Sequence, residues 1–172
     1  MTAHLRPATP ADAAIIALLG RITFAETFGS LFRERQDDLS TYLDATFDVT
    51  KLERSLDKRE NSYWLAHRQR LPVGYAKLKH PSPPPRRTEH ACQLQKIYVL
   101  REFLGQRIGC DLMREVMRAA AERAPLLWLD VLQENTRAAR FYERFGFAAA
   151  GADTYAIGAQ RFSFISMQRR TP

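Results

Sequence analysis

Two glycines that follow a strand-like segment mark the first place in this sequence where chemistry could occur. Gly105 and Gly109 stand between the apolar segment Leu94–Leu100 and a run with helical spacing. The unpaired N–H groups and the dipole at the start of a helix attract phosphate. Arg101 and Arg107 would add positive charge. The pattern indicates a candidate phosphate or pyrophosphate site, although glycine at such a junction is also common in ordinary turns.

A second candidate residue lies in the helix predicted after Asn135, a typical N-cap residue. Ala138, Phe141 and Tyr142 follow at helical spacing, so their side chains share one inward face. Phe141 fits a packed core, whereas Tyr142 carries a hydroxyl that needs a partner when buried. Tyr142 also lies one turn beyond Ala138, whose small side chain leaves space. We therefore single out Tyr142 as a functional candidate.

Together the two segments resemble the GCN5-related N-acetyltransferases (GNAT), which use acetyl-coenzyme A. The family pattern Asn-x-x-Ala-x-x-Phe-Tyr-x-x-x-Gly-Phe is matched at Asn135, Ala138, Phe141, Tyr142, Gly146 and Phe147. The strand, loop and helix that bind pyrophosphate are matched at Tyr98, Val99, Gly105, Ile108 and Gly109. The resemblance implies one N-acetyltransferase domain over residues 1–172 with an α/β fold. Its central mixed sheet would have about seven strands, helices on both faces and a splayed pair of parallel central strands.

The resemblance also implies the roles of the matched positions. Acetyl-coenzyme A would bind at Ile97, Tyr98, Val99, Leu104, Gly105, Gln106, Arg107, Ile108, Gly109, Asn135, Ala138 and Arg144. Its pantetheine arm would pair with the strand edge, and a backbone N–H near Val99 would polarise the thioester carbonyl. The substrate amine would attack directly in a ternary complex. Tyr142 would then be the catalytic acid that protonates the leaving thiolate.

Two features depart from the family pattern. The loop usually reads Gln or Arg, two variable residues, Gly, one variable residue, then Gly or Ala, but here Leu104 stands first and Arg107 replaces the central glycine. The Arg107 side chain would either crowd the pyrophosphate or point outward and add a cation. In addition, many members carry a general base, Glu, on the preceding strand. Gln93 and Gln95 occupy that strand here, and neither accepts a proton at neutral pH.

The acceptor is indicated by a weaker resemblance and by charge. The N-terminal region is similar to bacterial spermidine/spermine acetyltransferases, with Glu26 and Phe28 as candidate substrate contacts. The stretch 34–48 carries five acids against Arg35 alone, and we expect it to face a cationic acceptor. A polyamine or another small cationic amine is therefore the expected substrate. A protein or peptide N-terminal acetyltransferase and a non-catalytic coenzyme A sensor remain alternatives.

Length and charge narrow the class of protein. A chain of 172 residues predicts one domain, and its 45% hydrophobic and 26% charged residues are typical of a globular protein. The formal charge of +7 permits phosphate-bearing partners. Residues 1–60 carry 8 − 10 = −2, and residues 61–172 carry 18 − 9 = +9. Because the basic residues are dispersed among acids, we do not expect nucleic-acid binding.

Cysteine and histidine spacing adds little chemistry. Cys92 and Cys110 form neither a disulfide framework nor, with the scattered histidines, a metal site. We therefore expect no metal. No apolar run reads as a signal peptide or a membrane span, so a cytoplasmic setting is expected. The residue pattern leaves a homodimer open.

The chemistry must be positioned by alternating helices and strands. The periodicity predicts elements at His4–Pro7 (strand), Pro10–Phe28, Asp37–Ala45 and Asp48–Asp57 (helices), Ser62–His67, Pro72–Leu78 and Leu94–Leu100 (strands), Gly105–Arg123 (helix), Leu126–Leu132 (strand), a helix capped by Asn135, and Phe147–Ile157 and Phe162–Met167 (strands). This order predicts a mixed sheet covered on both faces.

Overall fold

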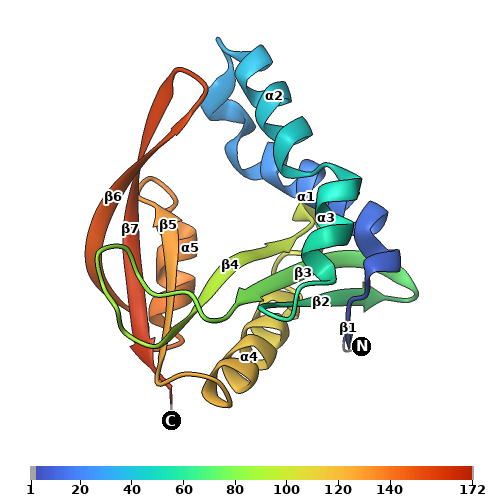
Figure 1. Ribbon diagram of the computed structural model, residues 1–172. Coiled ribbons are helices and arrows are strands. Elements are labelled where there is room, and N and C mark those ends of the chain that lie inside the picture. The colour runs from blue at the N-terminus through green and yellow to red at the C-terminus, as the bar shows by residue number, and fades with distance from the viewer. Residues whose placement is uncertain (1–2, 172) are drawn as a thin grey trace.

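The computed structural model describes residues 3–171 and shows one mixed β-sheet between two helical layers (Figure 1). The strands are β1 (His4–Pro7), β2 (Asn61–Arg68), β3 (Leu71–Lys79), β4 (Ala91–Val99), β5 (Leu126–Leu132), β6 (Ala148–Ile157) and β7 (Gln160–Arg170). The helices are α1 (Ala13–Phe28), α2 (Gln36–Thr46), α3 (Val49–Leu56), α4 (Ile108–Ala121) and α5 (Thr136–Glu143). The expected α/β class and element order are confirmed.

The sheet has seven strands in the order β1-β2-β3-β4-β5-β7-β6. All neighbours are antiparallel except β4 and β5, which run parallel at the centre. The parallel pairing joins Ala91–Gln93 to Leu126–Trp128 and stops there. Beyond Gln93 the two strands diverge, so the expected splayed pair is present and leaves an unpaired edge inside the sheet.

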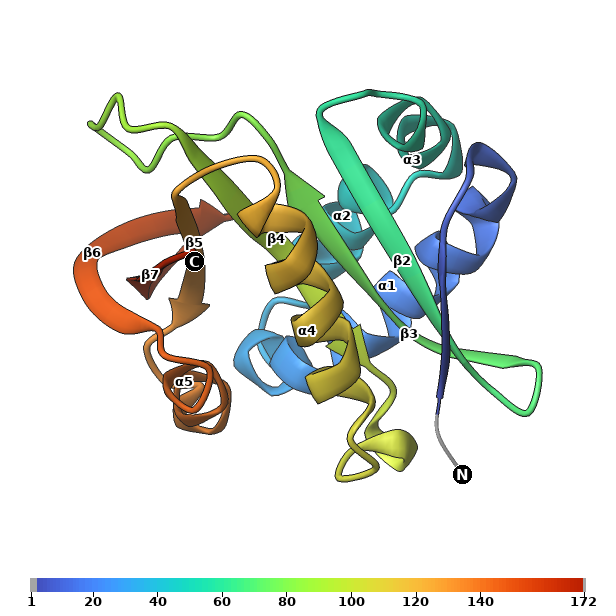
Figure 2. The ribbon, with the colours of Figure 1, turned by 90° about the horizontal axis from the view of Figure 1, so that it is seen from below.

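Helices cover the two faces of the sheet and bury separate cores. The first three helices lie on one face and α4 lies on the other (Figure 2). Ile16 and Phe24 of α1 pack with Leu65 of β2 in one core. Leu112 of α4 packs with Leu127 of β5 in the other. Burial of these apolar side chains from both faces holds β3, β4 and β5 in place beneath the site.

One segment has the length and apolar composition of a membrane span. It covers Pro10–Phe32 and includes α1. Ile16, Leu19 and Phe24 of this segment are buried against the sheet.

Local signals set most of the element boundaries. Thr9 and Asp12 form a capping box before α1, and the Asn135 side chain caps α5 as expected. The helix predicted from Gly105 begins instead at Ile108. Gly105 and Arg107 have φ angles of 80° and 65°, left-handed values that a right-handed helix cannot include. β7 extends to Arg170, beyond its predicted end at Met167.

The β6–β7 hairpin reaches across the molecule to the helical layer. Its tip meets α2 at the top of the view in Figure 1. The Asp38 carboxylate on α2 accepts a hydrogen bond from the Ala159 N–H at 3.2 Å. This contact closes a ring of elements around the opening between β4 and β5.

Candidate functional site

A cavity of about 960 Å³ lies where β4 and β5 diverge. It brings together α1, α2, β4, the loop before α4, β5, α5 and β7. All of the residues predicted to bind coenzyme or acceptor line it, except Gln106. Gln106 is exposed and its Nε2 donates to the Glu102 carbonyl at 3.3 Å, and its contact with the coenzyme stays a prediction.

The unpaired edge of β4 supplies backbone donors to this cavity. Leu100 donates its N–H to Val73 on β3 at 2.9 Å. Because successive N–H groups of a strand point to opposite edges, the N–H groups of Val99 and Ile97 point toward the opening. The side chain of Tyr98 packs near Tyr75, with 5.8 Å between ring centroids. The Tyr98 side chain therefore packs in the core beneath the helical layer, while the backbone N–H groups of Ile97 and Val99 lie at the unpaired edge.

Gly74 on β3 allows the backbones of β3 and β4 to approach closely beside this edge. Gly74 pairs with Val99, and a Cβ added at Gly74 would lie 2.5 Å from the Tyr98 carbonyl oxygen. Such a contact is far inside van der Waals distance, so a larger residue would displace the backbone of β4. The position of the Val99 N–H therefore depends on a glycine in the neighbouring strand.

The loop before α4 forms the expected candidate phosphate site, but with Arg107 where the family has glycine. Gly105 and Arg107 both take left-handed backbone conformations directly before the first turn of α4. Arg107 is exposed, lines the cavity and forms no ion pair with any of residues 3–171. Of the two expectations for Arg107, this placement favours an added cation. The N-terminus of α4 with a free guanidinium beside it suits a phosphate group.

Tyr142 lies on α5 at the side of the cavity opposite β4. Its ring packs against Phe141 and Phe147, with centroids 5.5 and 6.0 Å away. Burial raises the pKa of Tyr142 above its usual value. No hydrogen bond joins the Tyr142 hydroxyl to another residue of the described chain. The phenol therefore stays protonated at neutral pH and is free to donate to a ligand.

The remaining predicted residues of α5 lie around Tyr142. Asn135 Oδ1 accepts the Ala138 N–H at 3.1 Å, which leaves its Nδ2 group for a ligand. Ala138 lines the cavity as expected from its small side chain. Arg144 is exposed, with its guanidinium 6.0 Å from the centre of the Phe141 ring. All three residues therefore line the same cavity as Tyr142.

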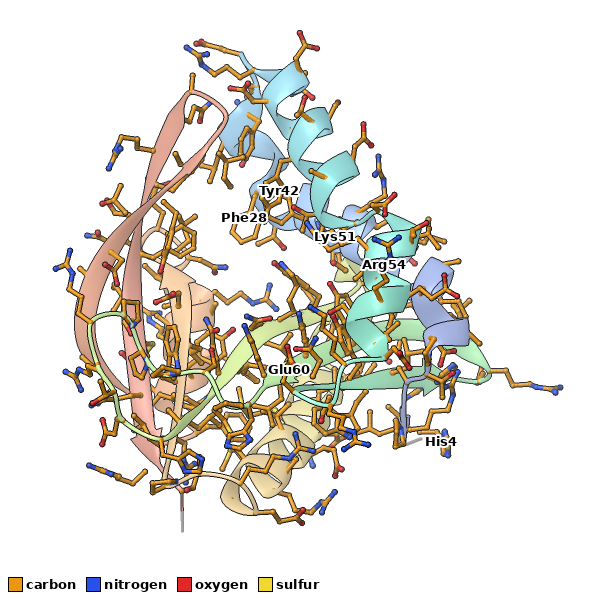
Figure 3. The ribbon with its side chains drawn as sticks, viewed as in Figure 1. His4, Phe28, Tyr42, Lys51, Arg54 and Glu60 are labelled. Carbon is orange, nitrogen blue, oxygen red and sulfur yellow. The ribbon has the colours of Figure 1, made fainter. Side chains whose placement is uncertain are left out.

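The acceptor side is lined by aromatic rings. Phe28 and Tyr42 lie together on the side of the helical layer that faces β5 and the hairpin (Figure 3). Both rings pack on Phe24 with centroid distances of 4.7 Å. Phe162 and Phe164 of β7 line the same cavity. Such a surface suits methylene groups and cationic nitrogens.

Glu26 has a partner within the protein. Its Oε2 accepts the Arg101 N–H at 3.0 Å, and its backbone carbonyl accepts from the Arg101 guanidinium at 2.5 Å. Glu26 therefore ties α1 to the loop before α4. It still lines the cavity, but one carboxylate oxygen is already occupied.

The expectation that the acidic stretch 34–48 faces the acceptor is wrong. Asp44 pairs with Arg21 at 2.7 Å, Asp48 caps α3, and Asp38 accepts from Ala159. Within this stretch Tyr42 lines the cavity and none of the acids does. Most of these carboxylates hold helices and the hairpin in place, which explains their density without any role for a ligand.

β4 offers no carboxylate base. Gln93 Oε1 accepts from Ser82 Oγ at 3.0 Å and from Gln95 Nε2 at 3.1 Å, as expected for neutral amides. β4 does place an amine in the cavity, that of Lys96, which was not singled out from the sequence. Its Nζ lies 5.4 Å and 5.8 Å from the ring centres of Phe47 and Tyr98. Burial, with a smaller repulsion from Lys51, lowers the pKa of Lys96 to about 8.

Asp130 is the second residue that the sequence analysis missed. It lies midway along β5 and lines the cavity. Its Oδ2 accepts from the Tyr155 hydroxyl at 2.9 Å, whereas its Oδ1 is buried without a hydrogen-bond partner within residues 3–171. Burial raises the pKa of Asp130. A single acid inside the otherwise apolar strand Leu126–Leu132 was the available signal.

Known proteins share this architecture. Residues 26–147 match the model of the acetyltransferase (GNAT) family. An uncharacterised N-acetyltransferase of Mycobacterium bovis is 30% identical over 134 residues, which cover 77% of this chain and 82% of that protein. A PaiA N-acetyltransferase from Thermoplasma acidophilum, solved with coenzyme A, superposes with a TM-score of 0.82 at 16% identity over 99% of each chain.

A GCN5-related N-acetyltransferase from Rhodopseudomonas palustris superposes with a TM-score of 0.78 at 24% identity, covering 99% of this chain and 96% of that one. These two structural likenesses concern the fold. The family match and the mycobacterial relative concern the sequence itself, and the matched range 26–147 of the family includes the strand edge, loop and α5 residues described above. This chain is therefore an N-acetyltransferase of the GNAT family.

Proposed function

We propose that this enzyme transfers the acetyl group of acetyl-coenzyme A to the primary amine of a small cationic acceptor, with polyamines as the first candidates. Membership of the GNAT family makes acetyl-coenzyme A the cosubstrate. The acceptor class rests on the site. The observation that carries it is the continuity of one cavity from the loop before α4, past Tyr142, to the aromatic rings on α1, α2 and β7.

The residues of the cavity fit acetyl transfer by direct attack. The Val99 N–H points to the open edge, where it would stabilise negative charge developing on the thioester oxygen. The neutral amine nitrogen forms the C–N bond as the C–S bond breaks. The nitrogen loses one proton to solvent and the Tyr142 hydroxyl gives one proton to the sulfur. Tyr142 then regains its proton from solvent. The products are the acetylated amine and the free thiol.

The phosphate-bearing end of the cosubstrate fits the side of the cavity formed by the loop before α4. The loop amides at the start of α4 and the free guanidinium of Arg107 are there, and Arg144, the residue directly after α5, lines the same cavity. Neither arginine is neutralised by a carboxylate of the described chain. This asymmetry supports binding of the pyrophosphate at the α4 side and of the amine at the aromatic side.

A small acceptor suits the enclosure better than a polypeptide. The hydrogen bond between Asp38 and Ala159 joins α2 to the tip of the hairpin, and so bridges two of the elements that line the aromatic side of the cavity. An extended peptide needs an open groove along which its backbone can run. The closed ring therefore favours a small amine over a protein N-terminus.

An acetylation assay across a panel of amines tests the proposal. Release of free thiol from acetyl-coenzyme A is measured with aliphatic diamines, polyamines, monoamines that carry no second charged group, and peptides with free N-termini. We expect turnover with the cationic aliphatic amines. Turnover confined to peptides would reject the small-amine function, and binding of coenzyme A without turnover on any amine would indicate a sensor.

We also propose a cytoplasmic setting. Cys92 and Cys110 are both free thiols, and Cys92 is buried. Free cysteines suit a reducing compartment. Secretion to an oxidising compartment in a cell fractionation experiment would contradict this assignment.

A further inference from the structure

Asp130 has a carboxylate oxygen that nothing in the described protein satisfies. Leu127, Leu129 and Val131 of β5 pack into the core beneath α4, so Asp130 faces the opposite side of the sheet, where the aromatic cavity lies. Tyr155 donates to Oδ2, while Oδ1 is buried and unpaired. A buried carboxylate oxygen without a donor is unfavourable. Oδ1 is therefore open to a ligand that brings a hydrogen-bond donor.

We propose that Asp130 binds a second, non-reacting ammonium group of the acceptor, and that Tyr155 holds the Asp130 carboxylate in place. This inference rests on the proposed acetylation of a small amine and specifies its substrate as a diamine or longer polyamine. An ammonium group offers three N–H donors and a positive charge, which together satisfy a carboxylate.

The strand register separates Asp130 from the transfer site. Gln93 and Trp128 lie opposite each other at the end of the parallel pairing. Asp130 is two residues beyond Trp128, and Val99 is six residues beyond Gln93, one of them in a β-bulge. At a rise of about 3.3 Å per residue, the Val99 N–H is displaced roughly 10–13 Å along the sheet from Asp130. Asp130 therefore reaches a second nitrogen rather than the attacking one.

The space between the two positions suits a methylene chain. Phe162 and Phe164 of β7 line the cavity on the same side as Asp130. The rings of Tyr155 and Phe164 lie 5.2 Å apart at 77°, which places an aromatic edge beside the carboxylate. Aromatic rings bury methylene groups and attract ammonium groups. The aromatic rings would contact the methylene chain of an aliphatic diamine, and Asp130 would bind its second ammonium group.

The other charged groups of the cavity do not take this role. Glu26 already accepts the Arg101 N–H at 3.0 Å. Lys96 lies over the rings of Phe47 and Tyr98 and forms no ion pair with Asp130 or with any other carboxylate of residues 3–171. Among the cavity carboxylates of residues 3–171, Asp130 is thus the one whose unpaired oxygen is buried.

Steady-state kinetics with matched amines tests the proposal. The acceptors are diaminohexane and hexylamine, which share one chain length and differ by one amino group. The readout is the ratio of their kcat/KM values in the wild type, Asp130→Asn, Tyr155→Phe and Asp153→Asn. Asp153→Asn removes the same charge from neighbouring β6 outside this cavity and is the matched control. Melting temperature and coenzyme A affinity report on folding.

We expect the wild type to prefer diaminohexane, and Asp130→Asn to lower the ratio by roughly 10- to 100-fold, mainly through KM. Tyr155→Phe, whose site is partly exposed and tolerates the change, should lower it about two- to tenfold. Asp153→Asn should change it by less than either. An unchanged ratio in Asp130→Asn and Tyr155→Phe, or equal loss on both amines, would overturn the role of Asp130 while leaving small-amine acetylation intact. Failure of the wild type to acetylate either amine would reject both proposals.

Discussion

The Asp38 carboxylate accepts a hydrogen bond from the Ala159 N–H and so joins α2 to the tip of the β6–β7 hairpin. Replacing Asp38 by Ala should loosen this closure on the acceptor side and leave the loop before α4 unaffected. We expect the KM for the amine to rise about two- to fivefold, with the KM for acetyl-coenzyme A nearly unchanged. Asp37→Ala, at an exposed neighbour, is the control. Equal changes in both variants would contradict a specific role for Asp38.

Loss of the Tyr142 hydroxyl should slow the chemical step selectively. The hydroxyl forms no hydrogen bond within residues 3–171, so Tyr142→Phe removes a proton donor without leaving a protein group unpaired. We expect kcat to fall roughly 100-fold or more, with coenzyme A affinity measured by calorimetry close to that of the wild type. Phe145→Leu on the next turn controls for repacking of α5. A variant that kept its full kcat would remove Tyr142 from the catalytic role.

Backbone strain at Arg107 should be measurable. Arg107 has a φ of 65°, a region that glycine enters without the cost that other residues incur. Arg107→Gly should therefore be about 1 kcal/mol more stable to denaturant than Arg107→Ala, since both lose the same guanidinium.

Both Arg107 variants should also bind acetyl-coenzyme A more weakly. The difference from the wild type should shrink as salt is raised, because the lost contribution is electrostatic. Equal stability of the two variants would show that the loop relaxes around Arg107. Salt-independent KM values would show that its charge does not reach the phosphates.

The half-buried Lys96 should make stability rise with pH. Its pKa is about 8 in the folded protein against 10.5 when exposed, so between these values the unfolded chain binds a proton that the folded one has released. The free energy of unfolding therefore increases with pH in this window. Lys96→Met should remove this contribution and be the more stable protein at pH 7, by on the order of 2 kcal/mol.

Urea titrations at about pH 7, 8 and 9.5 measure how the free energy of unfolding depends on pH. Lys58→Met, at an exposed lysine, provides the comparison for loss of a surface charge. Lys96→Met and the wild type should converge as the pH rises. A constant difference between them across the series would show that Lys96 does not titrate in this range.

The parts of the site that could be predicted are those that depend on neighbouring residues in the chain. Asn135 caps its own helix, and Ala138 and Tyr142 follow on the same inward face. Gly105 supplies a left-handed turn before α4. In each case the physical cause acts over a few residues, so the motif and its structure coincide.

The parts that could not be predicted depend on distant partners. The acids of 34–48 suggested a cation site, but Asp38 is held by a hairpin 121 residues away and Asp44 by Arg21 on α1. The Asp130 carboxylate is oriented by a hydrogen bond from Tyr155, which lies on another strand. A charge pattern along one segment does not show which opposite charge or amide the folded chain will bring to it.

The gap between β4 and β5 changes where this protein exposes its backbone. Strand edges at the rim of a sheet can pair with other chains and start aggregation. Here an additional edge lies in the middle of the sheet, bordered by α1, α5 and the hairpin. A slender extended ligand can pair with it, but a neighbouring protein strand with its full set of side chains cannot enter. The interior edge thus selects for the width of what binds before any side chain takes part.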